Sequence, residues 1–292
     1  MNFVVIFLVY AKINGTKIFF DVYGLQFEPV EERMVERSVT FVLHGGPGMD
    51  HTYLLPWLKP LEKVTQMVFV DHRSTGLSEE HTSIETWTIE QFADDIEALR
   101  QYLGLEKINL MGSSFGGMWS LVYATRYPYN VRRIVLVDTA ASWDTWKEAQ
   151  KIAEEKATDE QKKIVKDVFE GKVRTREEQR KWWEVMLPLY FYKYDEKIGR
   201  ELISRSRGSP ILAAHMFREI IPKYDVRNKL WMITSPTLVI VGKHDWITPV
   251  SQAEEIQRLI PNSKLVVFEK SGHMPFIEEN EKFIHVVSEF LG

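Results

Sequence analysis

A serine with a glycine two residues to either side is the pattern in this sequence with the most specific chemical meaning. The segment Gly112-Ser113-Ser114-Phe115-Gly116 lies between an apolar run and a segment with helical periodicity. In such a strand–turn–helix setting the serine sits on a sharp, strained turn, where only small flanking residues fit and the hydroxyl projects above the sheet. We therefore predict that Ser114 is a nucleophile and that a helix begins near Phe115. Ser113 is the alternative serine, but glycines do not flank it symmetrically.

A serine hydroxyl becomes a good nucleophile only when a base removes its proton and an acid orients that base. His273 and Asp245 stand where two later apolar runs end, and the chain order serine, acid, histidine is typical of this kind of turn. The sequence therefore predicts a catalytic triad of Ser114, Asp245 and His273. Asp138 also follows an apolar run and is the second choice for the acid. His244 is adjacent to the acid and is less suited to bridge it to the serine.

A glycine-rich loop is expected to hold the negative charge that develops on the substrate oxygen. The apolar run 39–43 is followed by HGGPG at residues 44–48, where backbone N–H groups can approach a ligand closely. Each donor of such an oxyanion hole contributes about 3 kcal/mol of transition-state stabilisation. We predict that the N–H groups of Gly46 and Phe115 form this hole. Taken alone, the segment is equally typical of a tight glycine–proline turn.

The composition argues against other chemistries. The 292-residue chain carries 37 Lys and Arg against 41 Asp and Glu, so it has no basic surplus for binding nucleic acid. It contains no cysteine and no metal-binding or phosphate-binding motif, and its 8 histidines are scattered. We therefore expect no metal, no other cofactor and no nucleic-acid partner. The expected substrate is a small molecule or a short peptide, and the oligomeric state is left open.

The N-terminal region predicts a hairpin. Asn14-Gly15 separates two apolar and β-branched segments, residues 3–13 and 17–23, and this dipeptide favours the tight turn in which both central residues have positive φ. The apolar run 3–11 is too short to span a bilayer and lacks the basic leader of a secretory signal. We therefore predict an antiparallel hairpin and a cytoplasmic protein that does not enter a membrane.

Six nearly continuous apolar runs follow, as expected of strands buried on both faces of a parallel sheet. They cover residues 39–43, 67–70, 108–111, 134–137, 238–241 and 265–268. Helices are expected at 89–103, 249–260 and 280–291. Thr88 and Gln91 would form a capping box for the first of these helices, and Thr248 would cap the second. This alternation predicts an α/β fold with a mostly parallel, doubly wound sheet led by the antiparallel hairpin.

The strand–helix alternation breaks once, between residues 139 and 236. Five segments there have helical periodicity: 146–158, 159–170, 175–187, 196–206 and 211–221. An insert that leaves and rejoins a sheet at strand ends lies over the carboxyl edge, where open α/β sheets bind their ligands. We therefore expect two domains. Residues 1–138 and 237–292 would form the core, and residues 139–236 a helical cap.

The chain resembles the α/β-hydrolase superfamily over essentially its whole length, and within it the proline iminopeptidase family. The motifs that carry the resemblance are HGGPG at 44–48, DHRSTGLS at 71–78, GSSFGG at 112–117, GKHD at 242–245 and the histidine at 273. The resemblance implies the α/β-hydrolase fold, the same triad and a helical cap that bounds the substrate pocket. Trp182-Trp183-Glu184 is similar to a cap motif of the family that binds the substrate's free amino group. This similarity implies Glu184 and Trp183 as substrate-binding residues, with Glu219 as a second candidate glutamate.

Three functions are open at this point. The first is an aminopeptidase that releases N-terminal proline from small peptides, for which the protonated amine needs an anionic partner such as Glu184. The alternative is a carboxylesterase or lactonase with the same triad, in which Trp183, Tyr190, Phe191 and Trp246 line an apolar pocket. The third is a binding protein on a hydrolase scaffold, which would not need an intact triad and oxyanion loop together.

Overall fold

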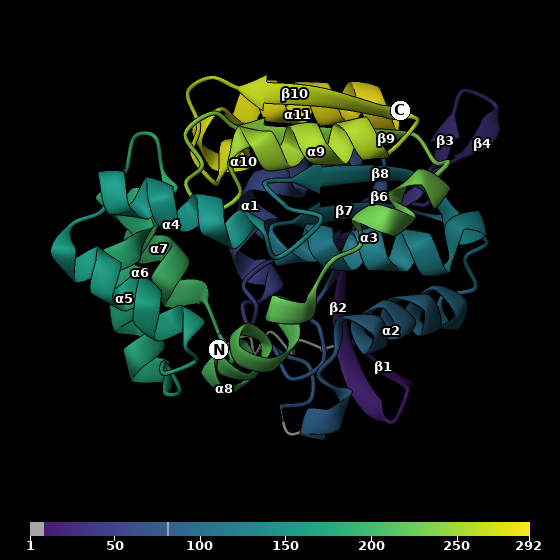
Figure 1. Ribbon diagram of the computed structural model, residues 1–292. Coiled ribbons are helices and arrows are strands. Elements are labelled where there is room, and N and C mark those ends of the chain that lie inside the picture. The colour runs from purple at the N-terminus through teal and green to yellow at the C-terminus, as the bar shows by residue number, and fades with distance from the viewer. Residues whose placement is uncertain (1–8, 81) are drawn as a thin grey trace, which may run out of the picture.

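The computed structural model describes residues 9–80 and 82–292, which are arranged around one large sheet (Figure 1). Its 8 strands follow the order β1-β2-β6-β5-β7-β8-β9-β10; the last six pair in parallel, and β1 and β2 at one edge are antiparallel. The strands are β1 (Tyr10–Ile13), β2 (Thr16–Tyr23), β5 (Val39–Leu43), β6 (Gln66–Val70), β7 (Ile108–Ser113), β8 (Val131–Val137), β9 (Thr237–Gly242) and β10 (Ser263–Phe268). The predicted fold class is confirmed, and each of the six apolar runs forms a strand.

The N-terminal hairpin forms as predicted over its described part. The turn between β1 and β2 places Asn14 at φ 45° and Gly15 at φ 74°, values that Asn-Gly adopts at little cost. Residues 3–8 of the predicted first strand lie outside the described residues. A second hairpin, β3 (Phe27–Val30) with β4 (Arg33–Glu36), is not among the predicted elements. Its strands are largely exposed and therefore lack a buried apolar run.

Side chains of the parallel strands alternate between two hydrophobic layers, one on each face of the sheet. In β5, Phe41 and Leu43 join one layer and Val42 joins the other. The first layer is covered by α2 (Ile89–Tyr102), α3 (Phe115–Arg126) and α9 (Val250–Leu259), and the second by α1 (Leu55–Leu58), α10 (Pro275–Glu278) and α11 (Asn280–Leu291) (Figure 1). Burial on both faces explains why these strands read as continuous apolar runs. Across the described ranges, no helix is both long and apolar enough to cross a membrane.

Two helix starts differ from the prediction. Thr88 caps α2 by accepting a hydrogen bond from the backbone N–H of Gln91, but the Gln91 side chain donates to Asp95 and does not complete the capping box. Helix α9 has no side-chain cap, because the Thr248 hydroxyl donates to Asp245 instead. In both cases a polar side chain makes a different contact from the one that the local pattern suggests.

Between β8 and β9 the chain forms a series of helices, which Figure 1 shows gathered beyond one end of the sheet. We call residues 139–236 the helical insert. Its helices are α4 (Thr145–Lys156), α5 (Asp159–Phe169), α6 (Arg176–Tyr190), α7 (Glu196–Arg205) and α8 (Pro210–His215), and α8 continues as a π-helical turn, Met216–Ile220. The N–H of Ser209 donates to the Gly48 carbonyl, and the N–H of His273 donates to the Tyr190 carbonyl, both at 2.7 Å. These bonds fasten the insert to the loops that follow β5 and β10, at the carboxyl edge of the sheet.

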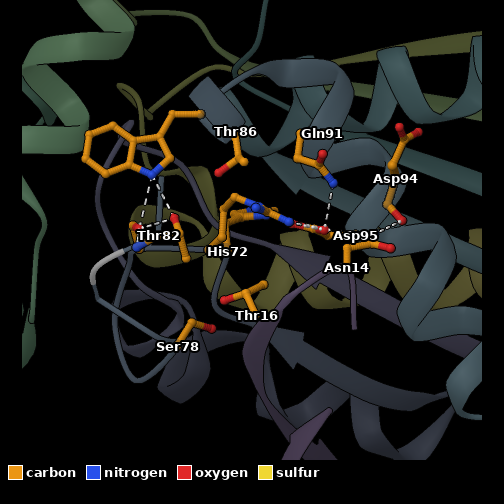
Figure 2. Close-up of polar contacts among 12 residues, drawn as sticks. Asn14, Thr16, His72, Ser78, Thr82, Thr86, Gln91, Asp94 and Asp95 are labelled. Carbon is orange, nitrogen blue, oxygen red and sulfur yellow. Dashed lines mark hydrogen bonds and ion pairs between the residues drawn. The ribbon is translucent and has the colours of Figure 1, made fainter. Parts of the chain in front are cut away.

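The turn after β6 is anchored by a buried ion pair. Nε and Nη2 of Arg73 each donate to the Asp95 carboxylate on α2 at 2.6 Å, and the two side chains are 2% and 5% exposed. Figure 2 shows the amides of Asn14 and Gln91 directed at the same carboxylate, to which they donate at 3.0 and 3.1 Å. These donors offset the cost of burying the Asp95 charge, and they tie the N-terminal hairpin to α2.

Loss of the arginine should be costly, because it would leave the Asp95 charge without its cationic partner. We expect Arg73→Met to lower the free energy of unfolding by about 3–5 kcal/mol. The control is Arg200→Met on α7, which breaks an exposed pair with Glu196 and should cost less than about 1 kcal/mol. Urea unfolding followed by tryptophan fluorescence measures both variants. Small and equal losses would contradict the importance of the buried pair.

Candidate active site

Ser114 occupies a strained turn that its glycine neighbours permit. It joins β7 to α3 with φ 56° and ψ −118°, and its N–H donates to the Val137 carbonyl on β8 at 2.8 Å. A Cβ at Gly112 would overlap the carbonyl of Gly116, and a Cβ at Gly116 would overlap the carbonyl of Leu43 on β5. Glycine at both positions therefore lets α3 approach the sheet closely enough to hold Ser114 at the carboxyl end of β7.

His273 and Asp245 are joined by a hydrogen bond. Nδ1–H of His273 donates to Oδ2 of Asp245 at 2.7 Å, and both side chains are buried, so Nε2 is the ring nitrogen left to accept a proton. Asp245 also accepts from the N–H groups of Ile247 and Thr248 at 2.9 and 3.2 Å, and from the Thr248 hydroxyl at 2.6 Å. Burial acts to raise the pKa of Asp245, but the charge of His273 and these hydrogen bonds outweigh it and hold the pKa below its ordinary value.

Ser114 and His273 line one narrow pocket under the helical insert. Its volume is about 20 Å³, which is room for about one water molecule. The lining residues are Gly46, Met49, Tyr53, Ser113, Ser114, Trp183, Tyr190, Ile247, His273 and Met274. Trp183 and Tyr190 belong to α6, so the width of the pocket depends on where this helix of the insert lies. A ligand larger than a water molecule can enter only if some of these side chains move apart.

Two backbone N–H groups beside Ser114 are available to a ligand. Within the part of the chain that the structure describes, the N–H groups of Gly46 and Phe115 donate to no acceptor. The N–H of Gly45, in contrast, donates to the Tyr53 hydroxyl at 2.8 Å. Burial raises the pKa of Tyr53 to about 12, so this side chain stays neutral. Both N–H groups that the sequence predicts for the oxyanion hole therefore lack an acceptor among the described residues.

The aromatic residues predicted to bind substrate are only partly brought to this pocket. Trp183 and Tyr190 line it. Trp246 and Phe191 are buried but are not among the lining residues. Trp246 packs edge-on against Tyr190, with 5.5 Å between the ring centroids. It therefore supports a wall of the pocket.

The glutamates predicted to bind an amine do not reach this pocket. The Glu184 side chain is 50% exposed and pairs with Arg180 at 3.1 Å. Since helix residues turn by about 100° per position, a helix that points Trp183 into the pocket turns Glu184 away from it. Glu219 is 44% exposed and pairs with Arg218 at 2.9 Å.

Two of the alternative residues have side chains beside the predicted triad, and the side chain of the third packs elsewhere. Ser113 also lines the pocket. Asp138, Asp245 and His273 each offer an oxygen or nitrogen atom, and these three atoms lie within 4.8 Å of one another. His244 stacks on Tyr192 with 4.3 Å between ring centroids. The structure therefore places two acids, rather than one, beside the histidine.

Comparison with known proteins places the chain in a family. A family model described as alpha/beta hydrolase fold matches residues 41–280, and the chain belongs to this family of hydrolases. The proline iminopeptidase of Saccharolobus solfataricus is 31% identical to this chain over 97% of the chain and 91% of that protein. Within the α/β-hydrolases, the chain is therefore a member of the proline iminopeptidase-like family.

Solved structures share the fold. The proline iminopeptidase of Mycobacterium smegmatis aligns with a TM-score of 0.77 at 22% identity, covering 97% of each chain. An esterase from Exiguobacterium antarcticum aligns with a TM-score of 0.75 at 23% identity, covering 98% of this chain and 99% of that chain. At these identities the likeness establishes the α/β-hydrolase fold and does not distinguish a peptidase from an esterase.

A second His–Asp pair, which the sequence analysis does not single out, holds the loop that follows the HGGPG segment. Oδ1 of Asp71 accepts from the ring Nδ1–H and the backbone N–H of His51 at 2.8 and 2.9 Å, and Oδ2 accepts from the Leu77 N–H at 2.9 Å. Burial disfavours both charges, yet the hydrogen bond and charge of Asp71 raise the pKa of His51, and those of His51 lower the pKa of Asp71. The DHRSTGLS turn thus supports the loop that carries Gly46.

This pair predicts a pH-dependent stability. The raised pKa of His51 means that its contribution is complete below its ordinary value of 6.5 and is lost as the pH rises through the folded value. The lowered pKa of Asp71 means that its contribution is present above its ordinary value of 3.8 and is lost on acidification. We therefore expect His51→Asn to lower the free energy of unfolding most between about pH 4 and about pH 6.5, and to lower it less at higher pH.

Urea titrations of wild type and His51→Asn from about pH 4 to about pH 9 measure this difference. His285→Asn is the matched control, because His285 is 70% exposed and should show a much weaker pH dependence. A cost of His51→Asn that is equal at both ends of this range would show that the pair is not ionised in the folded protein.

Proposed function

We propose that this protein is a serine hydrolase in which Ser114 is the nucleophile, His273 the general base and Asp245 the residue that orients the histidine. One observation carries the proposal. A His273–Asp245 pair joined at 2.7 Å shares a buried pocket with a serine held in a strained turn. A base oriented by a buried acid is what the activation of a serine hydroxyl requires.

The chemistry follows from these positions. Nε2 of His273 takes the hydroxyl proton as Oγ of Ser114 bonds to the substrate carbonyl carbon. The carbonyl oxygen becomes negatively charged and is held by the N–H groups of Gly46 and Phe115, each contributing about 3 kcal/mol. His273 then gives its proton to the leaving group, which departs and leaves an acyl group on Ser114. Water, deprotonated by His273, attacks this ester and releases the acid.

We further propose that the helical insert acts as a cap domain, residues 139–236, over a core formed by residues 1–138 and 237–292. The contacts of Tyr190 and Ser209 with the loops after β10 and β5 support the position of the cap over the carboxyl edge of the sheet. Since Trp183 and Tyr190 line the pocket from the insert, the cap would select the acyl group that reaches Ser114.

The first candidate substrate is a short peptide with an N-terminal proline. Similarity to proline iminopeptidases over almost the whole chain supports it, and the pocket walls suit an apolar ring. The protonated amine of such a substrate needs an anionic partner. For Glu184 to serve as this partner, it must leave Arg180 and α6 must turn.

The second candidate is a carboxylesterase or lactonase activity, which needs no amine site. Its support is the lining of the pocket, in which no side chain among the described residues carries a carboxylate. A neutral acyl group would fit such walls without leaving a buried charge unpaired.

A paired assay decides between the candidates. We expect purified protein to hydrolyse proline p-nitroanilide, p-nitrophenyl butyrate or both, and Ser114→Ala to lose at least about a thousandfold in kcat because the nucleophile is gone. Circular dichroism checks that the variant is folded. Substantial turnover by folded Ser114→Ala would contradict the role of Ser114. Turnover of the ester alone would support the second candidate.

If the proline amide is cleaved, Glu184→Gln tests the amine contact. If Glu184 binds the substrate's amine, this substitution should raise KM for the proline amide and leave KM for the ester unchanged. Glu177→Gln is the control, because Glu177 lies on the same helix in an exposed pair with Lys181. Equal effects of the two variants would show that Glu184 is a surface residue.

A further inference from the structure

Asp138 is a buried acid that the proposed mechanism does not use. It follows β8, its side chain is 0% exposed and its backbone has φ 47°. Its N–H donates to the Ile240 carbonyl at 2.9 Å, and its Oδ1 accepts from the Gly242 N–H at 2.8 Å. Both contacts are with β9, so the residue is fixed against the strand that leads into Asp245.

The other oxygen of Asp138 has no donor. Oδ2 is buried, and among the described residues nothing donates a hydrogen bond to it. At the same time Asp138 lies close to Asp245 and His273, with one polar atom of each within 4.8 Å of the others. An ionised Asp138 would therefore be an underhydrated negative charge beside a second one, which is strongly unfavourable. A proton on Oδ2 removes this cost and turns the unpartnered oxygen into a donor.

The number of donors indicates which of the two acids carries the proton. Asp245 accepts hydrogen bonds from the His273 ring, from Ile247 and twice from Thr248. Asp138 accepts from Gly242 alone among the described donors. When two carboxyl groups share a buried site, the one with more donors stays ionised and the other stays protonated.

We propose that Asp138 is a neutral positioning residue whose protonated carboxyl donates from Oδ2 to the Asp245 carboxylate, so that it steadies the triad acid without adding a charge beside His273. This inference rests on the proposed triad. It assigns Asp138 a role different from the second-choice acid expected from the sequence, because Asp138 orients Asp245 rather than the histidine.

The electrostatic surroundings agree with this assignment. Burial and then the charge of Asp245 raise the pKa of Asp138 well above its ordinary value, and the single bond from Gly242 does not compensate. The other titratable groups that face the pair are His273, Glu278, Tyr53 and Tyr190. Burial raises the pKa of Glu278 as well, and this side chain accepts from the Gly272 N–H at 2.7 Å. None of these groups gives Asp138 a cationic partner of its own, because Glu278, Tyr53 and Tyr190 are never cationic and the His273 ring already donates to Asp245.

The first test is the pH profile of kcat/KM on whichever chromogenic substrate is turned over. In Asp138→Asn the amide can accept from Gly242 and donate to Asp245, so the acidic limb should keep its midpoint within about 0.5 units. Asp138→Ala lacks the donor, and kcat should fall about tenfold further than in the asparagine variant. If Asp138 is instead ionised, Asp138→Asn removes a nearby negative charge and lowers the midpoint by about 1–3 units. That shift would overturn the proposal.

The second test does not depend on turnover. Wild-type protein takes up a proton at Asp138 on folding once the pH exceeds the ordinary value of 3.8, so its stability falls as the pH rises towards the raised folded value. Asp138→Asn has no such proton uptake. Its urea midpoint relative to wild type should therefore increase between about pH 4 and about pH 8. The exposed Asp159→Asn on α5 is the control and should give a nearly constant difference. A flat or decreasing difference for Asp138→Asn would refute its neutrality, whether or not the Ser114 proposal holds.

A divalent cation bound by Asp138, Asp245 and His273 is the remaining alternative. We expect dialysis against EDTA to leave the pH profile and the urea midpoint unchanged, because the carboxyl proton takes the place of a cation. Loss of activity or stability on chelation, with recovery on adding Zn²⁺, would overturn the proposal.

Discussion

The site depends on the absence of side chains where helix α3 meets the sheet. Gly112 and Gly116 let backbone lie against backbone so closely that a Cβ at either position would overlap a carbonyl group. This contact holds Ser114 at φ 56°, a conformation that costs a residue other than glycine about 1–3 kcal/mol. The packing of α3, which is buried from Phe115 to Ala124, on β5, β7 and β8 offsets that cost. The proposed nucleophile is consequently fixed in place before any substrate arrives.

Around this serine, the number of donors at each buried carboxyl group governs its charge. Asp95 and Asp71 each pair with a basic side chain and also receive uncharged donors, and both anchor loops on the β6 side of the site. Asp245 pairs with His273 and is held by backbone and hydroxyl donors at the other side. Asp138 receives one donor and is accordingly assigned the proton. With Asp245 ionised and Asp138 protonated, only one negative charge lies next to His273. One carboxylate is what orienting a base requires.

The sequence predicts the sheet and the candidate triad because both follow from local rules. Strands buried on two faces must be apolar throughout, and a serine on a strained turn must have small neighbours. Contacts between distant segments escape such rules. Thr248 has the pattern of a helix cap but donates to Asp245, and Asp138 can be recognised as a neighbour of Asp245 only once β8 and β9 are paired. Glu184 matches a motif, yet the rotation of α6 points it towards Arg180, a detail that helical periodicity leaves undetermined.

The measurement that tests the central claim most directly is the location of a covalent adduct after reaction with a fluorophosphonate. These reagents phosphonylate a serine only when a neighbouring base activates it. The account predicts one phosphonyl group per chain, found by mass spectrometry on Ser114, and none after His273→Ala, which removes the base from an otherwise complete turn. An adduct on Ser113, or an unmodified wild-type protein that is fully folded, would contradict the account.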